Sequence, residues 1–257
     1  NFNRQQVRPC RIYMVEKNIE KAAKTLGSNG QLRVAINYGN SVLAQKDKVS
    51  RKPCGVSVDL AKELAARLSL DVKFHTFEAA RSVVEAIKSN RCDLAFLAID
   101  PLRGEHISYT KPYVKILGGY LTTASAPYTT VDNVDQTTIR IAVGKNAAYD
   151  LYLSRTLKNA ELVRASTTSG AVDLFLSEKL DLAAGIKTGL LAFAENRSDL
   201  KVLDGAFMEI KQAIGVSRRS ETAVPYLNKF IEEMLASGFI RDRLEASGQD
   251  PNIVVSR

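Results

Sequence analysis

The chain has 257 residues, 45% of them hydrophobic and 25% charged, which is the composition of an ordinary globular protein. With 15 glycines and 7 prolines, the chain is neither fibrous nor of low complexity. Its longest apolar runs, residues 94–99 and 180–186, are far shorter than the ~18–20 residues of a membrane-spanning helix. The length suits either one large unit or two lobes.

Charge and metal-binding residue types restrict the function further. There are 36 Lys and Arg against 28 Asp and Glu, a net charge of +8, but the basic residues are dispersed among acids. This pattern is typical of a mixed solvated surface, so we expect no nucleic-acid partner. The 2 histidines, His75 and His106, are isolated, and Cys10, Cys54 and Cys92 lie too far apart for a CxxC motif. We therefore expect neither a metal site nor a cofactor.

The N-terminal part of the chain predicts an extension followed by an α/β unit. Residues 1–30 form the extension, with a helix, because apolar residues recur there at helical spacing before Gly27-Ser28-Asn29-Gly30. The strands and helices that follow predict a βαβαβ unit, whose last strand is apolar enough to be buried on both faces. The predicted strands of this unit are 32–36, 71–74 and 93–99, and its helices are 57–70 and 79–89.

A second unit of the same kind follows residues 118–123, a segment that we expect to join the two. Two consecutive units predict an α/β protein with two lobes, each a sheet flanked by helices. The predicted strands of the second unit are 139–143, 162–164 and 180–186, its helices are 147–158, 169–177 and 190–195, and a strand at 213–216 and helices at 225–235 and 242–247 close the chain.

The segment after the strand at 93–99 contains the strongest candidate binding residue. A nucleophile elbow, a phosphate-binding loop and a dinucleotide fingerprint are all missing from the sequence. Instead, the strand leads into Asp100-Pro101-Leu102-Arg103, and ligands of open α/β sheets bind outside such strand ends. The guanidinium of Arg103 suits a carboxylate, although a surface ion pair with Asp100 or Glu105 is an equal alternative.

Several segments match a known family when they are read in order. Residues 55–61 read G-V-S-V-D-L-A, residues 93–103 end in D-P-L-R, and residues 109–113 read Y-T-K-P-Y, followed by G-K-N-A-A-Y at 144–149. This order resembles the family 3 extracellular solute-binding proteins, the amino-acid-type receptors of ABC importers. The resemblance runs from about Gln31 to Gly248.

The resemblance implies the type II periplasmic-binding fold, in which two lobes joined by two hinge crossings close on a ligand. Lobe 1 would comprise residues 31–118 plus 216–257, and lobe 2 residues 119–215. Arg103 matches the arginine that clamps the ligand carboxylate, and the start of the helix at 147 matches a helix N-terminus that donates to it. The predicted ligand-binding residues are Tyr38, Asn40, Phe77, Glu78, Ala98, Asp100, Arg103, Lys145, Asn146, Ala147, Tyr149, Ile186 and Lys187.

One departure from the family concerns the ligand's amine. Members that bind α-amino acids carry an aspartate for the ammonium group at the position of Ile186, and Lys187 follows here. This disfavours a free α-amine, although Asp100 or Glu78 could serve one from lobe 1. The hypothesis is a small carboxylate that lacks or masks its amine, or that presents a second anionic group to Lys145 or Lys187. A solvent-facing Lys187 is the alternative.

The predicted function is capture of a small carboxylate, an amino acid or a similar organic acid, for an ABC importer. The resemblance implies a membrane ABC permease as partner and the periplasm as location, and we expect a monomer. One alternative is a lyase on the same fold, of the cyclohexadienyl dehydratase type, with Glu78 or Asp100 as general acid. Another is a cytoplasmic or sensor-attached binding module, because residues 1–30 contain no signal-peptide pattern.

Overall fold

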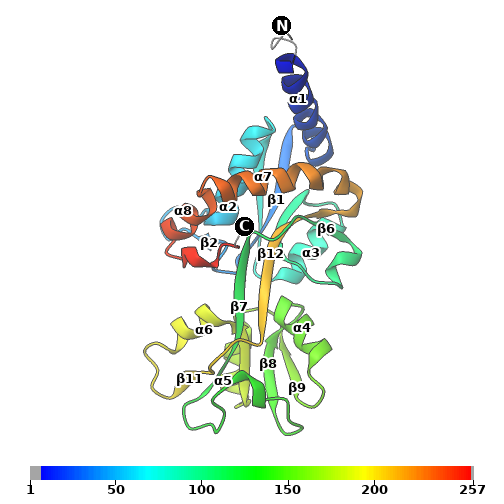
Figure 1. Ribbon diagram of the computed structural model, residues 1–257. Helices are drawn as coiled ribbons and strands as arrows, with labels where there is room; N and C mark the ends of the chain where they lie inside the picture. The colour runs from blue at the N-terminus through cyan, green and yellow to red at the C-terminus, as the bar shows by residue number, and fades with distance from the viewer. Residues whose placement is uncertain (1–6, 256–257) are drawn as a thin grey trace.

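One mixed sheet runs through both halves of the molecule (Figure 1). The computed structural model describes residues 7–255, with side chains from residue 16 onward; residues 1–6 of the predicted N-terminal extension and residues 256–257 lie outside the described residues. The strands of the sheet are β1 (Gln31–Asn37), β4 (Asp71–Phe77), β5 (Leu94–Ala98), β6 (Ile107–Tyr109), β7 (Val114–Thr123), β8 (Arg140–Gly144), β9 (Glu161–Ala165), β10 (Leu182–Ile186), β11 (Leu200–Val202) and β12 (Met208–Ser217). Their order is β4-β1-β5-β12-β7-β10-β8-β9, with β6 beside β12 and β11 beside β7.

The helices lie around this sheet. A small separate hairpin, β2 (Gln45–Lys46) with β3 (Pro53–Cys54), occupies the long connection after β1. The α-helices are α1 (Val7–Leu26), α2 (Val56–Arg67), α3 (Ala80–Lys88), α4 (Ala148–Thr156), α5 (Gly170–Ser177), α6 (Lys187–Ala194), α7 (Val224–Ala236) and α8 (Phe239–Ala246), and the short 3-10 turns are η1 (Arg103–Glu105), η2 (Val131–Asn133), η3 (Arg218–Ala223) and η4 (Pro251–Ile253). No helix in the described part of the chain is both long and apolar enough to cross a membrane.

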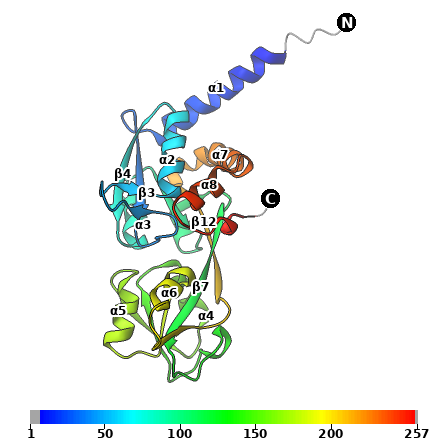
Figure 2. The ribbon, with the colours of Figure 1, turned by 90° about the vertical axis from the view of Figure 1, so that its left-hand side faces the viewer.

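Lobe 1, as we use the term, contains β4, β1, β5 and helices α2, α3, α7 and α8. Strand β1 pairs in parallel with both β4 and β5. All five residues of β5 are buried, as its apolar sequence predicts for a central strand. Helix α1 extends away from this lobe (Figure 2). Ala22 and Leu26 in its last turns are buried in the core.

Lobe 2 contains β9, β8, β10 and β11 with helices α4, α5 and α6. Strand β8 pairs in parallel with both β9 and β10, so β9-β8-β10 repeats the arrangement of β4-β1-β5. Leu182, Ala183 and Ala184 of β10 are buried between helices, because this strand too is central in its unit. The sheet of each lobe is therefore built from one βαβαβ unit, as the sequence predicts.

Two long strands connect the lobes. Residues 212–216 of β12 pair with β5 in lobe 1, and residues 208–212 pair antiparallel with β7. The other half of β7, at 118–121, pairs with β10 in lobe 2. Figures 1 and 2 show this antiparallel pair spanning the space between the two bodies. The chain thus crosses between the lobes twice, through one two-stranded ribbon.

The sequence underestimates these connecting strands. The sequence predicts a joining segment at residues 118–123, but these residues belong to the ten-residue strand β7. The predicted strand at 213–216 is only the second half of β12. The other predicted strands and helices are present with ends shifted by a few residues, because a frayed or capped end depends on tertiary contacts that periodicity does not record.

Candidate functional site

Arg103 is held at the end of β5 by the turn that follows that strand. Oδ1 of Asp100 accepts the backbone N–H groups of Leu102 at 2.9 Å and Arg103 at 3.3 Å, which fixes the turn. The Arg103 side chain is 5% exposed and points back toward the strand end, where Nη1 donates to the carbonyl of Ala98 at 3.2 Å. The turn therefore places a guanidinium in the protein interior at the carboxyl edge of the sheet.

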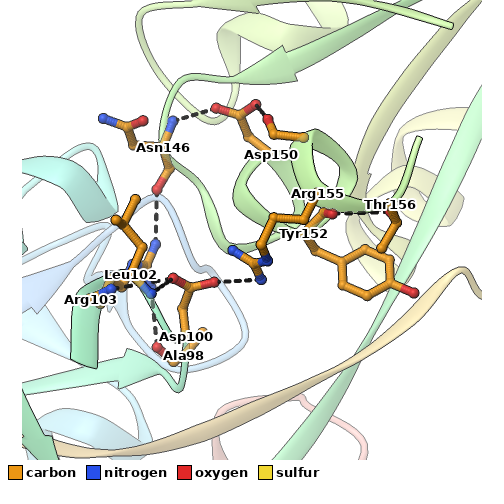
Figure 3. A network of polar contacts seen from close by, with 10 residues as sticks. Ala98, Asp100, Leu102, Arg103, Asn146, Asp150, Tyr152, Arg155 and Thr156 are labelled. Carbon is orange, nitrogen blue, oxygen red and sulfur yellow. Dashed lines mark hydrogen bonds and ion pairs between the residues drawn. The ribbon is translucent and has the colours of Figure 1, made fainter. Parts of the chain in front are cut away.

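The same guanidinium contacts lobe 2 (Figure 3). Nη2 of Arg103 donates to the carbonyl of Asn146, in the loop between β8 and α4, at 2.9 Å. Asn146 has a φ of 61°, a left-handed conformation that asparagine tolerates. Its N–H donates to buried Asp150 at 2.7 Å, and Asp150 is paired with Arg164 at 3.0 Å. The carbonyl that receives Arg103 is thus oriented by an ion pair inside lobe 2.

Arg103 is a buried cation without an anionic partner. Asp100 is close in sequence, but its Oδ2 pairs with Arg155 of α4 at 2.9 Å, and Arg103 makes no ion pair within residues 16–255. Burial lowers the pKa of the Arg103 guanidinium, an effect that nearby Tyr109 and Asp100 oppose, yet an arginine remains cationic at neutral pH. Burying a charge without a counter-ion is costly, so this site favours an anion.

A small cavity of about 40 Å³ lies beside Arg103, between the lobes. Lobe 1 lines it from the ends of β1 and β5 and the start of α3, lobe 2 from the start of α4, the end of β10 and the loop after β9, and β12 contributes from the connecting ribbon. Arg103 is the one charged residue in this lining. The lining residues are Asn37, Gly39, Asn40, Ala80, Phe96, Leu97, Ala98, Arg103, Ala147, Ala148, Tyr149, Thr168, Ile186, Ile210 and Gln212.

Two further features of the cavity suit a polar anion. No side chain caps the N-terminus of α4, and that end meets the cavity at Ala147 and Ala148. A free helix N-terminus presents unpaired N–H groups and a partial positive charge. The Oδ1 atom of buried Asn40 has no hydrogen-bond partner among the described residues. The site therefore combines one cation, free amide donors and an unpartnered polar side chain.

The structure brings about half of the predicted ligand-binding residues to this cavity: Asn40, Ala98, Arg103, Ala147, Tyr149 and Ile186. Asn146 contributes its carbonyl to Arg103, and Asp100 fixes the turn and pairs with Arg155. The remaining predicted residues, Tyr38, Phe77, Glu78, Lys145 and Lys187, do not line it.

The residues outside the cavity have other surroundings. Tyr38 packs against the main hydrophobic core, which includes residues of both lobes, and Phe77 packs against a smaller core cluster of lobe 1. Glu78 and Lys145 are exposed. Lys187 begins α6, and its Nζ donates to the carbonyl of Gly205 at 2.6 Å. The charged groups of Glu78, Lys145 and Lys187 therefore do not face the cavity in this arrangement of the lobes.

Sequence reasoning missed several lining residues for identifiable reasons. Thr168 comes from the loop after β9, a strand end of the same kind as the one that revealed Arg103, so this signal was available. Ile210 and Gln212 lie in the first part of β12, which periodicity did not predict as a strand. Gln212 is 3% exposed and carries its amide in the ribbon between the lobes.

A larger groove, of about 490 Å³, lies between α1 and α7 in lobe 1. Its arginine, Arg67, is paired with Glu63 and Glu233, so the groove has no buried unpaired charge comparable to Arg103. Size alone would select this groove, whereas chemistry selects the cavity between the lobes. No group of three or more His, Cys, Asp or Glu side chains among the described residues could hold a metal ion.

The comparisons agree with the class of protein that this architecture defines, a two-lobed solute receptor. The model of the bacterial extracellular solute-binding proteins, family 3, matches residues 32–246. The chain belongs to this family, which confirms the resemblance predicted from its motifs. No curated protein sequence matches the chain significantly.

Solved structures show the same fold. A mutant of ArgBP from T. maritima superposes with a TM-score of 0.75 at 19% identity, over 88% of this chain and 99% of that one. The amino acid ABC transporter substrate-binding protein AbpA from Streptococcus pneumoniae, bound to L-arginine, gives 0.74 at 21% identity, over 87% and 97%. The ancestral amino acid-binding protein AncCDT-1, a precursor of cyclohexadienyl dehydratase, gives 0.72 at 18% identity, over 87% and 98%. These similarities confirm the predicted type II periplasmic-binding fold.

Proposed function

We propose that this protein captures a small carboxylate between its lobes and delivers it to a membrane ABC permease. The observation that carries the proposal is Arg103, a buried guanidinium that lines the interlobe cavity and has no anionic partner among the described residues. Its bonds to the carbonyls of Ala98 and Asn146 use two of five N–H donors, so donors remain for a carboxylate. A bidentate carboxylate would offset the cost of burying the cation.

The ligand that suits this cavity carries a carboxylate and no free α-amine. The lining contains no acidic side chain, and its apolar wall includes Ile186 where an ammonium partner would be needed. Asp100 is committed to Arg155 and to the turn, and Glu78 is exposed away from the lining. An ammonium group would lose its hydration there without gaining a counter-ion. Deaminated or amine-masked acids are therefore favoured over the amino acids that similar structures hold.

Capture requires the lobes to move. A cavity of about 40 Å³ holds only a few non-hydrogen atoms, whereas ligand pockets usually measure ~300–1,000 Å³. Larger ligands must enter while the lobes are apart, and the β7–β12 ribbon is the segment that connects them. A ligand that contacts Arg103 of lobe 1 and the α4 N-terminus of lobe 2 would stabilise the closed arrangement. We also propose the periplasm as the location, as the family's extracellular role suggests, and a monomeric state.

The absence of an acidic side chain from the cavity lining does not favour the alternative of a lyase. A dehydratase needs a general acid beside the substrate. Glu78 and Asp100 were the candidates, and neither lines the cavity. We therefore propose a binding protein without catalytic activity.

A thermal-shift panel tests the proposal. The melting temperature of the purified protein is measured with amino acids, 2-keto acids, 2-hydroxy acids and dicarboxylates. The Arg103→Ala variant is measured with the same compounds. A ligand at one hundred times its Kd adds about 2.7 kcal/mol of stability, which is readily detected. We expect stabilisation by an acid lacking an α-amine, lost in the variant. A ligand that stabilises both proteins equally, or stabilisation by amino acids alone, would contradict the proposed site or ligand.

A further inference from the structure

The second charged contact between the lobes is an ion pair outside the ligand cavity. Nη2 of Arg155, on α4 of lobe 2, lies 2.9 Å from Oδ2 of Asp100 in lobe 1. Neither residue lines the cavity beside Arg103. Figure 3 shows Arg155 reaching from α4 toward the Asp100 carboxylate, next to the contact between Arg103 and Asn146. In lobe 1 the two contacts come from the same turn, whereas in lobe 2 Asn146 precedes the first turn of α4 and Arg155 lies in its last turn.

The burial of this pair is unequal, and the inequality indicates its role. Asp100 is 3% exposed and Arg155 43% exposed. The Asp100 carboxylate also accepts two backbone N–H groups through Oδ1, so it is held in place before lobe 2 arrives. Arg155 therefore pairs with a carboxylate that its own turn orients and that is buried when the lobes are together. Such a pair is stronger and less screened by salt than an exposed one.

We propose that Arg155 and Asp100 form a clasp that holds the two lobes together in the absence of ligand. The proposal rests on the hinge movement of the proposed function but not on any ligand. Without Arg155, closing the lobes would leave a buried carboxylate without a cation, which disfavours the closed form. With Arg155, part of the closure energy comes from the protein itself. The ligand then needs to supply less, which raises its apparent affinity.

The distance between the lobes in ligand-free protein measures the clasp directly. Val49 in lobe 1 and Leu191 in lobe 2 are both exposed, so each can be replaced by a spin-labelled cysteine in a Cys10→Ser, Cys54→Ser background. Pulsed electron paramagnetic resonance then measures the distance between the two labels. We expect mainly the short distance in the otherwise unchanged protein. Arg155→Ala should lower the closed-to-open ratio about tenfold, and Asp100→Asn, which keeps the Oδ1 acceptor, should do the same. The double variant should be no more open than either single variant.

A matched control separates the clasp from a general loss of charge. Arg33 and Asp93 form a partly buried pair, 2.6 Å apart with 23% and 11% exposure, but both residues lie in lobe 1 and neither lines the cavity. Arg33→Ala should leave the closed population unchanged, and Arg155→Lys should restore part of it. A protein that is already open without ligand, an Arg155→Ala variant that stays closed, or equal opening in Arg33→Ala would overturn the proposal. Because no ligand is added, these results stand apart from any failure to find one.

Discussion

The two βαβαβ units have the same strand order but different strand ends. In lobe 1 the third strand, β5, leads into a turn that buries Arg103. In lobe 2 the third strand, β10, ends at Ile186, and α6 begins at the next residue. The first connection also differs, since β1 and α2 are separated by a long loop with a hairpin while β8 and α4 are separated by residues 145–147.

Because of this difference, the two lobes contribute different chemical groups to the site. Lobe 1 contributes a fixed charge, because a turn after β5 can point a long side chain back into the cleft. Lobe 2 contributes backbone groups and an apolar wall, because a short connection brings the α4 N-terminus directly to the cavity. The repeated unit provides the scaffold, and the connections provide the chemistry.

The largest effect is expected from removing the charge of lobe 1. Arg103→Ala should weaken carboxylate binding at least about 30-fold, or about 2 kcal/mol, because the anion loses its buried bidentate partner. Arg103→Lys keeps the charge but loses the planar pair of N–H donors, so its affinity should lie between those of Arg103→Ala and the unchanged protein. Titration calorimetry with the acid found in the thermal-shift panel measures both. Equal affinity in Arg103→Ala and the unchanged protein would refute the claim that lobe 1 supplies the charge that binds the carboxylate.

The second prediction concerns a substitution that adds a negative charge to the lobe 2 side of the cavity. Ile186→Asp places a carboxylate at the cavity, where it can accept an ammonium group. The ratio of affinities for an α-amino acid and its 2-keto acid should rise about tenfold, because a hydrogen bond to a charged group is worth ~1.5–3 kcal/mol. Ile186→Asn has nearly the same size without the charge and is the control. If both substitutions change the ratio equally, charge at this strand end does not select the ligand.

The third prediction concerns the fit between the two surfaces. A methyl group on Gly39 of lobe 1 would lie 3.0 Å from Oγ1 of Thr168 in lobe 2 and 2.8 Å from the carbonyl of Glu78. Gly39→Ala should weaken binding several-fold, because overpacking of this kind costs ~1–3 kcal/mol. Gly189→Ala, in open space on α6, is the control and should bind normally. Normal binding by Gly39→Ala would mean that the lobes do not approach each other this closely.

The smallest effect is expected far from the cleft, at the edge strand of lobe 1. Burial, reinforced by Lys73, Arg33 and Arg91 and opposed by Asp93, lowers the pKa of His75 in β4. The unfolded chain, with a histidine pKa of about 6.5, then binds more protons than the folded one, so stability falls as pH drops from about 6.5 through the folded pKa. His75→Gln should reduce this acid sensitivity slightly in urea unfolding between pH 7 and 5. An unchanged slope would exclude His75 as its source.

The fold could be predicted from the sequence where its signals are local. The apolar run at β5 and the helical spacing of Leu60 and Leu64 in α2 depend only on neighbouring residues. The ribbon could not be predicted, because Gly118-Gly119 in β7 are typical of a linker. Those residues form a strand because β12 and β10 pair with them from distant parts of the chain.

The site could be predicted only in part for the same reason. Arg103 was found because a buried strand, a proline turn and an arginine are adjacent in sequence. Gln212 reaches the cavity through tertiary packing and no local pattern marks it, whereas Thr168 follows the end of a strand, the same signal that marks Arg103. Asp100 was expected near the ligand, but its partner Arg155 lies 55 positions later, on a helix of the other lobe. Contacts between the lobes join residues that are far apart in the sequence, so no local spacing of residues predicts them.

The most direct measurement is titration of the unchanged protein with matched pairs of acids that differ only in the α-amine, each 2-keto acid beside its amino acid. Arg103 without an anionic partner, in a lining with no acidic side chain, predicts that at least one keto acid binds more tightly than its amino acid, by about tenfold. Tighter binding of the amino acid in every pair would contradict the account, because an ammonium group would then find a partner that this cavity does not contain.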